Sequence, residues 1–93
     1  MSRRHHFHID YLGHSISATV QTGHAPVLEV LVDGKETGYA TTKGDRPLTV
    51  AVELPNDPPT TVSVRATPGP GVPRCLLLAT ADGEPQVMAP RLY

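Results

Sequence analysis

Two consecutive segments, residues 5–12 and 15–22, alternate between apolar and polar side chains from Phe7 to Val20. Side chains of a β-strand point to opposite faces in turn, so each segment reads as a strand with one apolar face. We predict a two-residue turn at Gly13-His14, because glycine suits the positive φ of a type II′ turn. This register places Phe7 opposite Val20. The apolar face then consists of Phe7, Ile9, Tyr11, Ile16, Ala18 and Val20.

Six further strands are predicted at a spacing of about ten residues, with turns or loops between them. They are residues 27–32, 35–42, 48–54, 60–67, 75–80 and 85–90. Asp33-Gly34 and Asp82-Gly83 are hairpin turn signals, and the 10 prolines and 8 glycines disfavour long helices. The expected fold is a single all-β domain over residues 1–93, an antiparallel β-sandwich of about eight short strands built from hairpins. A barrel stays open as the alternative, and residues 1–4 are expected to form a flexible arm.

Alternation also predicts which side chains of the later strands face the core. The expected core-facing residues are Leu28, Val30, Tyr39, Leu48, Val50, Val52, Leu54, Val62, Val64 and Ala66. Leu31 falls on a mainly polar face, and Gly38 indicates a β-bulge. Residues 75–80 are apolar on both faces, which predicts a strand covered on both sides or lying at a subunit contact.

Composition excludes several classes of function. The net charge is −1 with neutral histidines, and no basic cluster of the kind that binds nucleic acid is present. No apolar stretch fits a signal peptide or a membrane span, so we expect neither membrane nor nucleic-acid partners. Cys75 has no second cysteine to pair with, which fits a reducing compartment and a cytoplasmic protein. Arginine outnumbers lysine in an Ala-, Pro- and Gly-rich chain, which is typical of a GC-rich bacterial genome.

Residues 13–39 combine an alternating strand, a loop, an apolar strand and the turn Val32-Asp33-Gly34-Lys35-Glu36. In this order of features the segment resembles the N-terminal β-sandwich of Fas apoptotic inhibitory molecule. The resemblance spans about 27 of the 93 residues, and the aromatic residues usual in that family's strands are missing here. It implies a compact antiparallel sandwich used for contacts without catalysis, and it carries over no functional residue.

A first candidate site consists of His6, His8 and Asp10, which project from one face of a strand at alternate positions. Imidazole and carboxylate groups are good ligands for zinc or copper, and His14 and His24 could join them from loops. The alternative is a solvated strand face that is rich in histidine.

Two further candidates concern nucleophiles. His14, Ser15 or Ser17, and Asp10 contain the residue types of a catalytic triad, but no Gly-x-Ser-x-Gly elbow accompanies them. Cys75 follows Arg74, which could lower the pKa of the thiol, whereas a lone cysteine beside an apolar run is more often a small buried hydrophobe. We expect neither catalysis nor a cofactor.

The apolar strands suggest an interface. We assign Leu31, Leu77 and Met88 to strand faces opposite the patterned core positions, where they could support self-association or docking of a partner. A loop covering one of these strands is the alternative. The leading hypothesis is a small non-catalytic interaction module, acting as a homodimer or with an unidentified protein partner. The alternative function is a histidine-based metal-binding protein using His6, His8 and Asp10.

Overall fold

The structure is a computed structural model that describes residues 3–23, 25–42, 46–55, 58–67, 73–78 and 84–91. These residues contain nine strands and no helix. The strands are β1 (Arg3–Tyr11), β2 (His14–Thr22), β3 (Val27–Val32), β4 (Lys35–Thr41), β5 (Leu48–Leu54), β6 (Thr60–Thr67), β7 (Arg74–Leu78), β8 (Gln86–Val87) and β9 (Ala89–Arg91).

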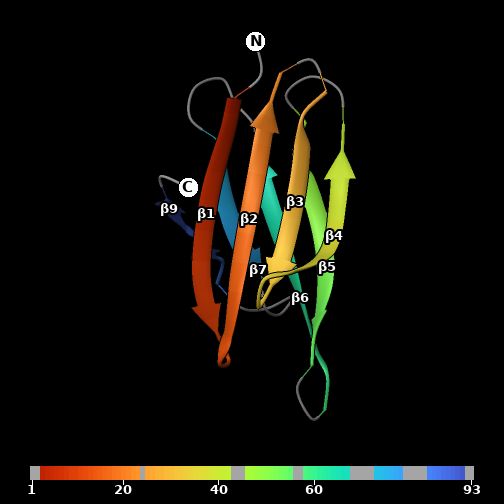
Figure 1. Ribbon diagram of the computed structural model, residues 1–93, viewed down its shortest axis with the longest axis vertical. Helices are drawn as coiled ribbons and strands as arrows, with labels where there is room; N and C mark the ends of the chain where they lie inside the picture. The colour runs from red at the N-terminus through yellow and green to blue at the C-terminus, as the bar shows by residue number, and fades with distance from the viewer. Residues whose placement is uncertain are drawn as a thin grey trace.

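The strands form two antiparallel sheets packed face to face, with β4-β3-β2-β1-β9 in one sheet and β5-β6-β7-β8 in the other (Figure 1). This arrangement confirms the predicted all-β antiparallel sandwich. Within each sheet, strands that follow one another in sequence pair with one another, except that β9 returns to lie beside β1. The short β8 and β9 therefore carry the end of the chain from one sheet to the other.

The first hairpin turns one residue earlier than predicted. Leu12 and Gly13 both have positive φ, 51° and 80°, and Tyr11 pairs with His14. Positive φ at both central residues defines a type I′ turn, whose twist matches that of the flanking strands. The predicted Gly13-His14 turn is therefore wrong, and Phe7 lies opposite Ala18 instead of Val20. The pairs shift by two residues, so every side chain keeps its predicted face.

The second hairpin contains a bulge that exchanges the inward and outward positions along part of β4. Val32 pairs with Lys35 as predicted, but the register shifts so that Val30 lies opposite Gly38. The prediction that Tyr39 faces the core is therefore wrong, because the extra residue turns its side chain outward, where it is 64% exposed. A Cβ at Gly38 would lie 2.8 Å from Cγ1 of Val50 on β5, so glycine allows the two sheets to approach at this edge.

The two ends of the chain also differ from the predictions. β1 begins at Arg3, and Arg3 and Arg4 pair with Thr22 and Gln21, so these two arginines belong to the sheet rather than to a flexible arm. The predicted strand 85–90 is two strands in different sheets, separated by Met88. The amide of Met88 donates a hydrogen bond of 3.1 Å to the carbonyl of Cys75. The predicted Asp82-Gly83 turn lies outside the described residues.

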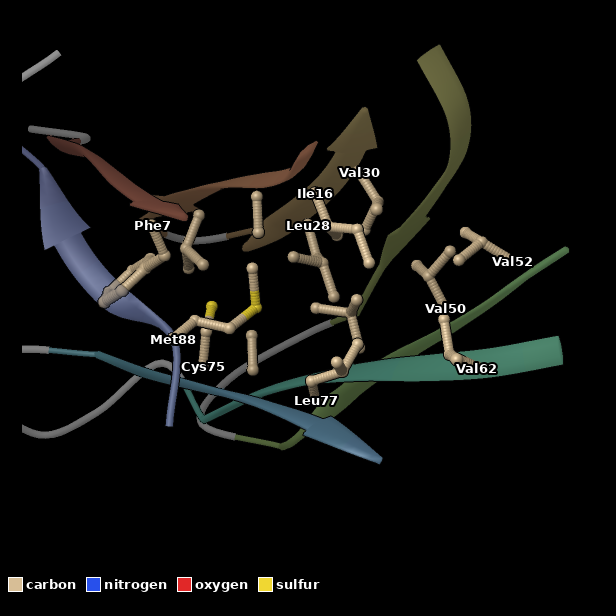
Figure 2. Close-up of a cluster of buried hydrophobic side chains, with 14 of the residues drawn as sticks. Phe7, Ile16, Leu28, Val30, Val50, Val52, Val62, Cys75, Leu77 and Met88 are labelled. Atoms are coloured by element: carbon tan, nitrogen blue, oxygen red, sulfur yellow. The ribbon is translucent and has the colours of Figure 1, made fainter. Parts of the chain in front are cut away.

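The core lies between the two sheets, and Figure 2 shows Phe7, Cys75 and Met88 gathered at one end of it. None of its described members is polar or charged. β5 and β6 alternate as predicted between buried and more exposed residues. The buried apolar residues are Phe7, Ile16, Ala18, Val20, Leu28, Val30, Val32, Leu48, Val50, Val52, Leu54, Val62, Val64, Ala66, Cys75, Leu77 and Met88.

Candidate functional site

The solvent-facing side of the five-stranded sheet, hereafter the outer face, carries most of the candidate residues. Strand register arranges its side chains in rows that cross the sheet from β9 to β4. One row consists of Arg91, His6, Thr19, Glu29 and Tyr39. The next row consists of Ala89, His8, Ser17, Leu31 and Glu36. The same strands bury Phe7, Ala18 and Val30 on their other side, so one alternation builds both the core and this face.

Two shallow hollows of about 380 and 310 Å³ lie on the outer face and share His6, Thr19 and Leu31. The first extends over Phe7, His8, Ser17, Ala18 and Arg91. The second extends over Arg4, Gln21, Val27 and Glu29. Leu31 is partly buried between them, as expected for an apolar side chain on a mainly polar face. The two hollows together form a trough whose shared centre holds Leu31 beside the polar side chains of His6 and Thr19.

His8 contacts groups from three strands. Its Nε2 lies 2.7 Å from Oγ of Ser15 and 3.4 Å from Oδ1 of Asp10, and its Nδ1 lies 3.2 Å from the guanidinium of Arg91. A guanidinium can only donate, so these partners assign Nδ1 as an acceptor and place the ring proton on Nε2. The Nε2–H then donates to Ser15. In this tautomer His8 cannot accept the Ser15 proton, which is what a general base must do.

The predicted metal ligands are not brought together as a chelating group. His6 directs Nδ1 to Oγ1 of Thr19 at 3.2 Å, while Arg91 occupies Nδ1 of His8. Within the described part of the chain, no three His, Cys, Asp or Glu side chains are close enough to hold a metal ion. The adjacent guanidinium charge would also repel a cation. His24, the other proposed ligand, lies outside the described residues.

His14 joins the two hairpin turns of the sheet through Asp33. Its Nδ1 donates to Oδ2 of Asp33 at 2.7 Å, and the Ser15 amide donates to Oδ1 of Asp33 at 3.0 Å. The Asp33 amide in turn donates to the carbonyl of Ser15 at 2.8 Å. The His14 hydrogen bond, followed by that of the Ser15 amide, holds the pKa of Asp33 below its ordinary value. These contacts do not support the candidate triad of His14, Ser15 or Ser17, and Asp10, because Asp33 orients His14 and the Ser15 hydroxyl contacts His8.

Asp33 was not predicted to have this role. The Asp-Gly signal indicated only a turn, and the contact with His14 depends on how the two hairpins align side by side.

Cys75 is a buried member of the core, and burial raises the pKa of its thiol to about 12. A thiol with such a pKa stays protonated at neutral pH and is a poor nucleophile. The structure thus supports the interpretation of Cys75 as a small buried hydrophobic residue over its interpretation as a reactive thiol. Arg74 is exposed on the preceding position of β7.

Of the three predicted interface residues, Leu31 alone lies on an outer surface. Leu77 and Met88 are 0% and 1% exposed within the core, so their assignment to a face opposite the core is wrong. On β7 the inward positions are Cys75 and Leu77, and Leu76 and Leu78 take the outer side. Met88 is buried because the chain crosses between the sheets at this residue. The most exposed large apolar residue described is Val87, at 74%.

The fold and this face together define an antiparallel β-sandwich with a polar-rimmed trough on one sheet. Comparison with protein-family models, curated proteins and solved structures finds no match to this chain. The similarity to Fas apoptotic inhibitory molecule stays a prediction. No helix among the described residues could cross a membrane.

Proposed function

We propose that this protein is a small non-catalytic interaction module that binds a protein partner through the outer face of the five-stranded sheet. The observation that carries the proposal is the trough with Leu31 at its centre, where the two hollows meet. A partly buried apolar side chain ringed by polar groups resembles, on a small scale, the apolar core and polar rim of a protein interface. The surrounding hydroxyl and imidazole groups offer hydrogen bonds to a partner.

The proposal of a non-catalytic role is supported by the state of the nucleophile candidates. Ser15 accepts a hydrogen bond from the protonated nitrogen of His8, and Cys75 is buried with a raised pKa. Neither group has the deprotonated form, or the base beside it, that nucleophilic catalysis requires. A free buried thiol is also consistent with our proposal that the protein works in the reducing cytoplasm.

Site-specific photocrosslinking tests this function. A benzophenone amino acid placed at Leu31 should form covalent adducts with the partner in the cell that naturally expresses the protein. The same group at Thr61, an exposed position on β6 of the other sheet, is the matched control and should give none. Adducts from Thr61 with none from Leu31 would move the interface to the four-stranded sheet, and no adduct from either position would contradict an interaction role.

A further inference from the structure

The charged side chains of the outer face are distributed unevenly across the sheet. The described cationic and histidine side chains of this face lie on β1 and β9, where Arg4, His6, His8 and Arg91 face outward. The acidic side chains Glu29 and Glu36 lie on β3 and β4. Asp10 is the acid of β1, and it lies at the hairpin end of that strand, beyond both rows. One side of the trough is therefore basic and the other acidic.

A surface with this asymmetry is complementary to itself in only one orientation. A twofold axis between two stacked outer faces can run across the strands or parallel to them. An axis across the strands would place each strand over its own copy, so that the basic strands β1 and β9 would face their equivalents and like charges would repel. An axis parallel to β2, the middle strand of the five, places β1 over β3 and β9 over β4 of the second copy. Basic and acidic sides then meet.

We propose that the outer face binds a second copy of this chain about a twofold axis parallel to β2. This inference rests on the proposed function, because it assigns the partner of the same face. The orientation agrees with aligned packing of sheets, in which the strand directions of the two layers differ by only about 30°.

The rows of the outer face determine which side chains meet in this dimer. A rotation about β2 keeps each row opposite itself, so His6 lies over Glu29 of the second copy, and Thr19 lies over its own equivalent. Arg91 lies over Tyr39 of the second copy, beside Glu29, where it can stack on the ring and pair with the carboxylate. In the next row His8 covers Leu31 of the second copy. This arrangement gives the exposed Tyr39 a packing partner.

The available area is small for a specific dimer. Five strands spaced about 4.8 Å apart, over roughly six residues of length, present about 500 Å² on each copy. The total of about 1,000 Å² is near the lower limit for a specific interface. We therefore expect a reversible dimer with a dissociation constant in the micromolar range, favoured by low ionic strength.

The test uses two charge reversals, Arg91→Glu and Glu29→Arg, followed by native mass spectrometry and sedimentation of each variant. Each variant alone places like charges opposite one another at both symmetric contacts, so its dimer dissociation constant should rise about tenfold or more. In an equimolar mixture every contact regains opposite charges, and the 1:1 heterodimer should form with nearly the wild-type affinity. Arg65→Glu, at an exposed position on the other sheet, is the matched control and should leave the dimer unchanged.

Circular dichroism establishes that each variant is folded before it is mixed. Within one copy Arg91 and Glu29 lie three strand spacings apart, about 14 Å, so neither reversal disturbs the other in the monomer. A wild-type chain that stays monomeric at high micromolar concentration overturns the second copy as the partner. The proposed function would still stand if Leu31 crosslinks to another protein. A dimer unaffected by both reversals, or two weakened variants that fail to form a heterodimer, overturns the proposed axis.

Discussion

The two faces of the five-stranded sheet come from the same strands but differ in what they contribute. The inner face holds apolar side chains with almost no exposure, such as Ile16 and Val30. The outer face holds partly exposed polar side chains in hydrogen bonds that are individually weak, such as His6 with Thr19. The inward-facing residues of each strand therefore provide stability, and the outward-facing residues between them provide the surface chemistry. Substitutions at neighbouring positions should have very different effects.

The largest expected loss of stability is at Leu77, and its neighbour Leu76 provides the contrast. Leu77→Glu places an unpaired carboxylate in the core, and it should cost about 4 kcal/mol or more and abolish the folded state. Leu76→Glu changes the next residue, which faces outward, and should stay folded with a cost of about 1 kcal/mol. Circular dichroism and urea unfolding of both variants measure the contrast. A folded, stable Leu77→Glu protein would show that this side chain is not in the core.

A smaller loss is expected where the chain crosses between the sheets. Met88→Ala removes a side chain that is 1% exposed, and we expect a loss of about 2–4 kcal/mol in the free energy of unfolding. Val87→Ala, one residue earlier and 74% exposed, should change that free energy by about 0.5 kcal/mol or less. Equal effects at the two positions would contradict the assignment of Met88 to the core.

Gly38 should show an effect of about 1–3 kcal/mol. Gly38→Ala adds a methyl group 2.8 Å from Cγ1 of Val50, which forces the edges of the two sheets apart. Val50→Ala removes the clashing atom, so the double variant should lose less stability than the sum of the single losses. Additive losses in urea unfolding would mean that the two residues are not in contact.

The smallest predicted effect is the pH dependence of the hydrogen bonds that join Asp33 in the second turn to His14 and Ser15 beside the first turn. The pKa of Asp33 is lowered in the folded state, so its contribution is present above its unfolded pKa and is lost as the pH falls through the folded value. Asp33→Asn should therefore lower the urea midpoint at pH 7, and the difference from wild type should shrink toward pH 2–3. A difference that does not depend on pH would exclude the ionised Asp33 as the stabilising group.

The sequence predicted which face of a sheet each side chain lies on better than it predicted which residues pair between neighbouring strands. Both the predicted and the observed first turns contain Gly13 at positive φ, so local signals did not separate them. Because the pairs shifted by an even number of residues, the alternation of Phe7 and Val20 still placed both in the core. Tyr39 was misplaced because a bulge at Gly38 was expected but its effect on register was not carried into the strand.

The wrong predictions for Leu77 and Met88, toward the C-terminal end, have two different causes. The run from Cys75 to Leu78 is apolar at every position, so alternation could not tell which side faces inward. Met88 lies at a crossing between sheets that depends on pairing of β9 with β1, more than 80 residues away in sequence. The same separation hides the contact of Arg91 with His8, which assigns the tautomer of that histidine.

The most direct test of the central claim is a dilution series of amide chemical shifts by NMR. As the protein concentration rises, the amides of Thr19, Glu29 and Leu31 on the outer face should shift together, with those of Ala51 and Thr61 on the other sheet unchanged. That result would place self-association on the five-stranded sheet. Shifts confined to the four-stranded sheet, or none across the micromolar to millimolar range, would contradict self-association through the outer face.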